Sequence, residues 1–292
     1  MIRSTLLRAS LPPEPVRQTV LSPSYRGGKG IVQMLSVTVI TKNEAKNIED
    51  CLRSVAWAQE IIVVDQYSTD GTADMAKGLG ARIYQEPWKG FAGQKNSAVE
   101  KATGDWILSL DADERVPAPL KEEIEATVGR KAALHGYFIA RKNFFSGQWI
   151  RHGGWYPDYC LRLFKKRSGR FEERAVHEKV LVDGPTGYLK NPLEHYTYRS
   201  VADYLIRMER YSRLAALEIQ EAKRPFLWSA LTLRPAFTFL NMALLRGGFL
   251  DGKKGLFLAA SYAYYTFLKY YRFSEKDLAP LDPEQDEKEE AS

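Results

Sequence analysis

Short apolar runs alternate with helical patterns along the first part of the chain. Apolar and β-branched residues predict strands at Leu35–Ile40, Glu60–Val64, Ala81–Gln85 and Trp106–Leu110. Helices are expected between them, at Ala45–Trp57, after the turn 68–72 and at Ala92–Ala102. Because strands that alternate with helices form parallel sheets with right-handed crossovers, the pattern predicts an α/β, Rossmann-like fold.

The pattern becomes less regular in the middle of the chain. A helix at Leu120–Val128 and a strand near Gly136–Ala140 are expected. The segment 141–200 is rich in Gly, Trp, Tyr, Arg and His and predicts short strands at best. We interpret this segment as the second half of the same domain.

The last third reads as helical and amphipathic. Residues 202–222 carry one apolar face, and two further apolar stretches follow at Phe226–Leu245 and Leu256–Leu268. The first holds Arg234 and Pro235 in its middle, and an Arg there costs about 2.5–3.5 kcal/mol on insertion. The second, with 13 residues, is shorter than the roughly 20 that a span needs. We therefore expect helices that lie in the membrane plane.

These patterns divide the chain into four regions. They are a disordered arm at 1–33, a catalytic domain at 34–200, a membrane-associating or dimerising helical region at 201–275, and an acidic disordered tail at 276–292. The arm combines arginines with prolines and lacks the apolar core of a secretory signal. Met34, directly before the first strand, is an alternative start of the chain.

Composition distinguishes between a membrane surface and nucleic acid as binding partners. The chain has 292 residues, 45% hydrophobic and 27% charged, which is ordinary for a globular protein. The net charge of +6 accompanies Arg207, Arg210 and Arg213 beside the aromatic residues Trp228, Phe237 and Phe239. This combination favours an anionic membrane surface, and no nucleic-acid recognition motif is found. Two cysteines make a disulfide framework untenable and favour a reducing cytoplasm.

Acidic residues follow three of the predicted strands. Glu44, Asp65 and the pair Asp111 and Asp113 lie where the strands end, and ligands of such sheets bind at that edge. Asp111-Ala112-Asp113 can hold Mg²⁺ or Mn²⁺ and a diphosphate, although an isolated turn of this kind is more often merely solvated. Asp65 can accept a hydrogen bond from a uracil N–H or a ribose hydroxyl, or simply cap a loop.

Four of these motifs together resemble glycosyltransferase family 2. They are Thr41-Lys42-Asn43-Glu44, Val64-Asp65-Gln66-Tyr67-Ser68-Thr69-Asp70-Gly71-Thr72, the stretch Gly93–Asn96, and Asp111-Ala112-Asp113. The resemblance is strong over about residues 35–135. It implies a GT-A fold with a nucleotide-binding half and an acceptor half, an inverting reaction and a divalent metal. Gln66-Tyr67 departs from the small or acidic residue that many relatives carry there.

Later motifs resemble the lipopolysaccharide core glucosyltransferase branch, whose members add a β-linked glucose to an inner-core heptose. These motifs are Gly153-Gly154-Trp155-Tyr156-Pro157-Asp158, Leu161-Arg162-Leu163-Phe164, Val176-His177-Glu178 and Gly248-Phe249-Leu250-Asp251-Gly252. The resemblance implies a UDP-glucose donor, a glycolipid acceptor and a peripheral location on the cytoplasmic face of the inner membrane.

The resemblance also implies roles for single residues. Thr41, Glu44 and Asp65 hold the nucleoside, and Asp111 and Asp113 hold ribose, metal and diphosphate. For two further residues, Lys95 and Arg162, both a functional and a structural role are possible. Lys95 contacts phosphate or is a solvated helix lysine, and Arg162 binds phosphate or forms a salt bridge.

Inversion requires a base that removes the proton of the acceptor hydroxyl. Glu178 and Asp158 are the two candidates, with Glu178 preferred because it stands where the family usually carries its acidic base. His177 beside it is interpreted as a positioning or core residue.

The sequence is also compatible with other acceptors and with another class of function. The acceptor can be a polyprenyl phosphate, a teichoic-type polymer or a peptide thiol, and the chain can form a homo-oligomer. A different class is a nucleotide-binding module without catalysis. A nucleotidyltransferase would carry a Gly-rich basic loop after the first strand, and Thr41–Glu44 is not such a loop.

Overall fold

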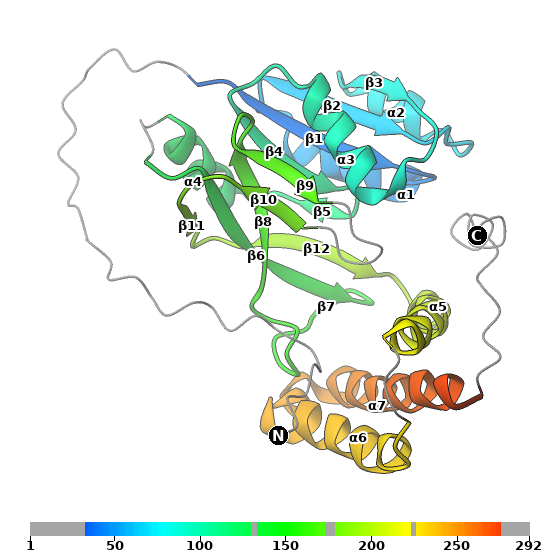
Figure 1. Ribbon diagram of the computed structural model, residues 1–292. Coiled ribbons are helices and arrows are strands. Elements are labelled where there is room, and N and C mark those ends of the chain that lie inside the picture. Colours follow the sequence, from blue (N-terminus) through cyan, green and yellow to red (C-terminus); the bar gives the residue numbers. More distant parts are fainter. Residues whose placement is uncertain (1–32, 130–132, 173–178, 223–225, 276–292) are drawn as a thin grey trace.

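The computed structural model describes residues 33–129, 133–172, 179–222 and 226–275. It shows a large mixed sheet flanked by helices, with a separate group of C-terminal helices (Figure 1). The strands of the large sheet are β1 (Leu35–Thr41), β2 (Glu60–Asp65), β3 (Arg82–Gln85), β4 (Trp106–Asp111), β5 (Glu114–Arg115), β6 (Gly136–Phe145), β7 (Gln148–Trp149), β8 (Asp158–Lys165), β11 (Thr186–Tyr188) and β12 (Leu193–Tyr198). β9 (Gly169–Glu172) and β10 (Lys179–Val182) form a separate antiparallel pair.

Helices connect the first strands and end the described chain. They are α1 (Ala45–Ser54), α2 (Thr72–Gly78), α3 (Gly90–Lys101), α4 (Ala118–Val128), α5 (Val201–Glu221), α6 (Ser229–Leu240) and α7 (Gly252–Glu275). A π-helix, Asn241–Leu245, and a 3₁₀ helix, Gly248–Asp251, join α6 to α7.

The main path of the sheet follows the order β3-β2-β1-β4-β8-β6-β12-β5. The first four strands are parallel, which confirms the predicted Rossmann-like half. Beyond them the sheet becomes mixed, because β8 runs antiparallel to both β4 and β6. The expectation of short strands at best in 141–200 was wrong for β8, which has eight residues. Arg162 interrupts its apolar pattern, and the sequence alone does not show that this charge is buried among acids.

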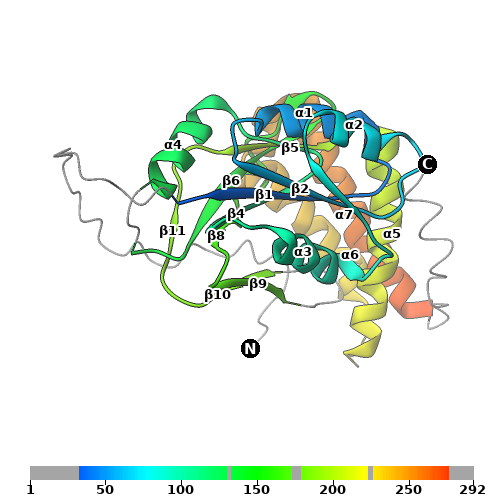
Figure 2. The same ribbon diagram turned by 90° about the horizontal axis from the view of Figure 1, so that it is seen from above.

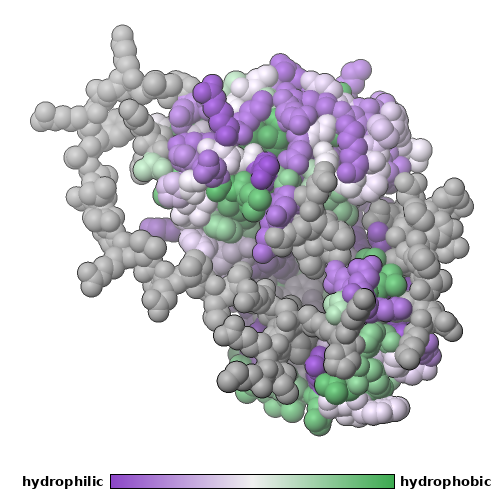
Figure 3. Space-filling model, in the orientation of Figure 1, coloured by the Kyte–Doolittle hydropathy of each residue, from purple (hydrophilic) through white to green (hydrophobic). Residues whose placement is uncertain are grey.

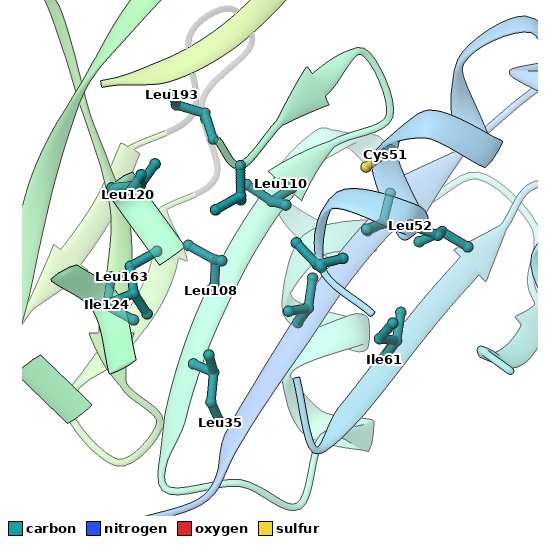
Figure 4. Close-up of a cluster of buried hydrophobic side chains, with 14 of the residues drawn as sticks. Leu35, Cys51, Leu52, Ile61, Leu108, Leu110, Leu120, Ile124, Leu163 and Leu193 are labelled. Carbon is teal, nitrogen blue, oxygen red and sulfur yellow. The ribbon is translucent and has the colours of Figure 1, made fainter. Parts of the chain in front are cut away.

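Helices cover both faces of the parallel strands (Figure 2). On one face, Leu52 of α1 and Leu120 and Ile124 of α4 join a cluster that includes Leu108 and Leu110 of β4 (Figure 4). On the other face, small residues of α3 pack with β2 and β4 in a second cluster. This buried frame fixes the strand ends, and with them the polar residues that follow.

The C-terminal helices join the catalytic part through a third core cluster. Phe145 and Trp155 pack there with Tyr204 of α5 and Leu258 of α7. Helix α7 has 24 residues and extends beyond the predicted Leu256–Leu268 at both ends. A side chain at Gly255 would collide with the carbonyl oxygen of Gly248, so this glycine belongs to a close packing contact rather than to a helix end. Within the described ranges, no helix is both long and apolar enough to cross a bilayer.

Candidate functional site

The ends of three parallel strands bring the predicted donor-site residues together. Thr41 at the end of β1 is in register with Asp65 at the end of β2. On the other side of β1, Ile40 is in register with Asp111, the last residue of β4. The side chains of Thr41, Asp65 and Asp111 therefore start from one edge of the sheet, as the strand pattern predicted.

Asp111 lies between two cations. Its Oδ1 atom is 2.8 Å from Nζ of Lys95 in α3, and its Oδ2 atom accepts a hydrogen bond from Nη2 of Arg162 in β8. Burial acts to raise the pKa of the Asp111 carboxyl, but Arg162 and Lys95 outweigh it and hold the pKa well below its usual range. Because the side chain is still 31% exposed, this ionised carboxylate remains accessible to a ligand.

Arg162 is held by a second carboxylate, that of Glu114. Nη2 of Arg162 lies 2.6 Å from Oε1 of Glu114, whose side chain is fully buried. The other Glu114 oxygen accepts a hydrogen bond of 3.0 Å from the backbone N–H of Asp111. With 5% of its surface exposed, Arg162 braces the two acids. This geometry supports the salt-bridge role that was left open for it.

The network continues to Asp158, one of the two base candidates. Its Oδ2 atom accepts hydrogen bonds from Nη2 of Arg141 at 2.6 Å and from Nδ2 of Asn143 at 3.1 Å. Arg141 also lies 3.6 Å from Glu114. Asp158 is thus the carboxylate partner of a half-buried guanidinium. The preferred base, Glu178, and its neighbour His177 lie outside the described residues.

Asp113 faces a histidine that the sequence did not single out. Oδ2 of Asp113 is 3.3 Å from Nε2 of His195 in β12. The other ring nitrogen, Nδ1, lies 2.7 Å from the amide oxygen of Asn143. Burial acts to raise the pKa of Asp113, but the charge and hydrogen bond of His195 outweigh it and lower the pKa. Asp113 is therefore an ionised, partly exposed carboxylate beside Asp111.

On the nucleoside side, Asp65 is fully buried and saturated with hydrogen bonds. Oδ1 accepts from the hydroxyls of Thr41 (2.9 Å) and Ser68 (2.5 Å). Oδ2 accepts from the backbone N–H of Ser68 (2.8 Å) and from Nε2 of Gln85 (3.4 Å). A nucleobase that bonds to Asp65 must displace one of these donors, and the long contact from Gln85 is the weakest.

Glu44 lies half-buried at the start of α1. Its Oε2 atom accepts a hydrogen bond of 2.7 Å from Nδ2 of Asn47. Burial raises the pKa of Glu44, and the hydrogen bond from Asn47 only partly offsets this. Two neighbours at this edge, Asn43 and Tyr67, have positive φ values of 53° and 49°. Such values are uncommon for residues other than glycine and often accompany functional sites.

Four residues of the site were not predicted from the sequence. Glu114, Arg141, Asn143 and His195 have no motif of their own, and their proximity depends on strands that pair far apart in sequence. Arg207 of α5 was expected to meet lipid headgroups, and this stays a prediction. Its guanidinium lies 5.5 Å from the centre of the Tyr198 ring and pairs with Asp203, and its charge acts to lower the pKa of Asp113.

The carboxylate oxygens of Asp111 and Asp113 are ligands of the kind that a hard divalent cation prefers. Both carboxylates are ionised and partly exposed, with 31% and 20% of their side chains accessible. No group of three or more His, Cys, Asp or Glu suited to a metal occurs among the described residues. Mg²⁺ is commonly bound through one or two carboxylates, with substrate phosphates completing its coordination.

Arg162→Met is expected to destabilise the fold, because it leaves Glu114 and Asp111 without their shared cation. Breaking a buried ion pair in this way costs about 3–5 kcal/mol. Chemical denaturation of the variant measures the loss. Arg167→Met, a change of an exposed arginine beyond the end of β8, is the matched control. Equal stability of both variants would contradict the bracing role.

Comparison with known proteins agrees with this geometry. The model of the family described as Glycosyl transferase family 2 matches residues 36–197. The lipopolysaccharide core biosynthesis glycosyltransferase LpsC of Rhizobium meliloti (strain 1021) is 29% identical over 266 residues, which cover 87% of this chain and 96% of the relative. An uncharacterized glycosyltransferase of Rickettsia typhi is also 29% identical, over 85% of this chain and 89% of its own.

A solved structure shows the same architecture. The mannosyltransferase PcManGT from Pyrobaculum calidifontis, in complex with GDP-Man and Mn²⁺, aligns with a TM-score of 0.50 at 17% sequence identity. The alignment covers 85% of this chain and 88% of that one. The fold is therefore of the GT-A type. The family match and the curated relatives show that the protein is a glycosyltransferase. By the match of residues 36–197, the chain belongs to glycosyl transferase family 2.

Proposed function

We propose that the protein is an inverting, metal-dependent transferase that moves glucose from UDP-glucose onto an inner-core heptose of lipopolysaccharide. The observation that carries the proposal is the pair of ionised, accessible carboxylates at the end of β4, beside the nucleoside-side edge of β1 and β2. The acceptor class rests on similarity to LpsC along nearly its whole length.

Each part of the edge has a task in this proposal. Glu44, Thr41 and Asp65 hold the nucleoside, and Asp111 and Asp113 hold the ribose and the metal. A divalent cation there supplies positive charge for the diphosphate as it leaves. Lys95 and Arg162 keep the Asp111 carboxylate ionised and in place. A base on the opposite face of the sugar removes the proton of the acceptor hydroxyl, so that one displacement inverts the anomeric centre.

Thermal shift with a panel of donors tests the nucleotide. With Mn²⁺ or Mg²⁺ present, UDP-sugars are expected to raise the melting temperature, whereas GDP- and ADP-sugars are not. Stabilisation by GDP- or ADP-sugars alone would refute the uridine assignment. Slow metal-dependent hydrolysis of UDP-glucose separates an enzyme from a catalytically inactive nucleotide-binding module, since such a module would show none. Polyprenyl phosphate, polymer and peptide acceptors are assayed in parallel.

We also propose that the protein binds peripherally to the cytoplasmic face of the inner membrane through α6 and the turn that follows it. Large apolar side chains are unusually exposed there, at Trp228 (78%), Leu233 (69%), Phe237 (56%) and Leu245 (76%). The space-filling view shows hydrophobic residues gathered over the C-terminal helices (Figure 3). Lys253 is exposed at the start of α7, beside this turn, and suits anionic headgroups. Such an apolar surface with basic residues is typical of interfacial binding.

Trp228→Glu combined with Leu245→Glu is expected to abolish flotation of the protein with vesicles of phosphatidylglycerol and phosphatidylethanolamine. Two negative charges on this exposed face oppose its insertion into the bilayer and repel the anionic lipids. Leu181→Glu, an exposed position on the separate β9–β10 pair, is the control and should bind like the wild type. If the double variant still floats with the vesicles, this face is not the membrane contact.

A further inference from the structure

A cavity of about 490 Å³ lies beside the strand-end site rather than in it. Its lining includes Asn47, Arg115, Phe144, Tyr196 and Arg199. The cavity shares its wall with the Asp111-Ala112-Asp113 turn, because Nη1 of Arg115 donates a hydrogen bond of 2.9 Å to the carbonyl of Ala112. The backbone N–H of Tyr196 donates to the carbonyl of Asp113 at 3.0 Å. An occupant would therefore contact Arg115 and Tyr196, the two residues that hydrogen-bond to the turn with the proposed donor-site carboxylates.

Two guanidinium groups give the cavity a positive character. Arg115 is held by the carbonyls of Ala112 and Glu114, at 2.9 and 3.1 Å. Arg199 is held at the first turn of α1, by the backbone carbonyl of Lys46 and the side chain of Asn47. Among the nearby carboxylates, Asp50 lies 3.6 Å from Arg115 with 73% of its side chain exposed. Glu194 accepts a hydrogen bond from the Tyr196 hydroxyl, and the charge of Arg199 acts to lower the pKa of Glu44. Both cations are fixed in position by the contacts above.

Aromatic rings form the rest of the wall. Tyr196, 36% exposed, stacks on Phe144 with ring centroids 4.8 Å apart and planes 10° apart. The Arg115 guanidinium lies 5.4 Å from the Tyr196 centroid. A site of this volume that combines aromatic walls with a few fixed polar groups has the character of a small-molecule pocket. Flat rings suit the C–H face of a sugar, and guanidinium groups suit phosphate or carboxylate oxygens.

We propose that this cavity binds an anionic sugar of the acceptor glycan, one that bears a phosphate or carboxylate group, next to the sugar that receives the hexose. The proposal rests on the proposed function, since it takes the acceptor to be a glycan. The proposal adds selection among acceptor glycans. Arg199 and Arg115 bind the anionic group of the neighbouring sugar, and this contact positions the acceptor against the donor site. The donor diphosphate is assigned to Asp111 and Asp113, on the other side of the shared turn.

Arg199→Ala tests the proposal. The probe is the deacylated core oligosaccharide from cells that lack this protein, together with its phosphatase-treated and its carboxyl-reduced forms. Loss of a charge-assisted hydrogen bond is expected to raise KM for the native oligosaccharide at least about tenfold. The kcat and the Kd of UDP are expected to stay within about twofold. Arg199→Lys, which keeps the charge, should recover part of the loss.

The modified acceptors and a matched arginine decide the outcome. Arg53→Ala removes an exposed arginine of the same region, on α1, and should leave KM unchanged. The effect of Arg199→Ala should vanish with the form of the oligosaccharide that lacks the recognised anion, and this identifies phosphate or carboxylate. A penalty of equal size with all three acceptors, no penalty with any, or a weaker Kd for UDP would overturn the proposal. Absence of transfer by the wild type would instead count against the proposed function.

Discussion

Asp113→Asn is expected to lower kcat for hexose transfer by about a thousandfold, with little change in the melting temperature. In the proposed donor site Asp113 contributes an ionised carboxylate to the cation, and an amide cannot neutralise a divalent cation. Removing preorganised charge stabilisation of this kind typically costs about 10²–10³ in rate. The fold should tolerate the change because the side chain is partly exposed and shares no buried cation with Glu114.

Transfer and UDP-glucose hydrolysis are measured across a titration of Mn²⁺, with a chelator as the blank. His195→Gln is the matched variant, because it removes the partner of Asp113 and keeps the carboxylate. It should lose far less activity than Asp113→Asn. If Asp113→Asn keeps more than about a tenth of wild-type turnover at saturating metal, Asp113 does not hold the cation.

The parallel half of the fold was accessible from the sequence. Its strands are runs of β-branched and apolar residues such as Val37–Ile40 and Ile61–Val64, buried along nearly their whole length, as in a sheet covered on both faces. Parallel register then places Asp65 and Asp111 on either side of β1. The strand-end edge therefore followed from local patterns and a topological rule.

The polar network around the turn was not accessible in the same way. Arg162 and Arg141 are charged residues within strands, and a pattern of hydrophobic and polar positions treats them as exposed. Their burial depends on Glu114 and Asp158, which β5 and β8 bring near through pairings far apart in the chain. His195 meets Asp113 only because β12 pairs with β5. Spacing in the sequence contains no signal for these contacts.

The C-terminal helices also differ from what the sequence predicted. The expected helix began at Leu256 because the apolar stretch begins there. In the structure α7 begins at Gly252, and close packing against Gly248 excludes any side chain at position 255. Composition predicted a lipid contact for Arg207, and that contact stays a prediction. It contained no signal for the position of the guanidinium 5.5 Å from the centre of the Tyr198 ring.

The identity of the base gives the second large expected effect. Glu178→Gln should lower kcat/KM by about 10²–10⁴, the usual contribution of general-base catalysis, while the Kd of UDP stays near the wild-type value. By the sequence resemblance, Glu178 stands where the family usually carries its acidic base, whereas Asp158 accepts hydrogen bonds from Arg141 and Asn143. Proton uptake by Asp158 would remove the carboxylate that bonds to the Arg141 guanidinium at 2.6 Å and leave Glu114, at 3.6 Å, as its remaining acidic neighbour. This loss opposes a role as base.

Asp158→Asn is the informative comparison. It breaks the pair with Arg141, so it should lower the melting temperature and reduce activity less than Glu178→Gln does. The pH dependence separates the two roles further. If Glu178 is the base, Glu178→Gln removes the acidic limb of the kcat/KM profile, and Asp158→Asn retains that limb at reduced amplitude. The opposite pattern, with the limb lost only in Asp158→Asn, would transfer the base to Asp158 and assign Glu178 a supporting role.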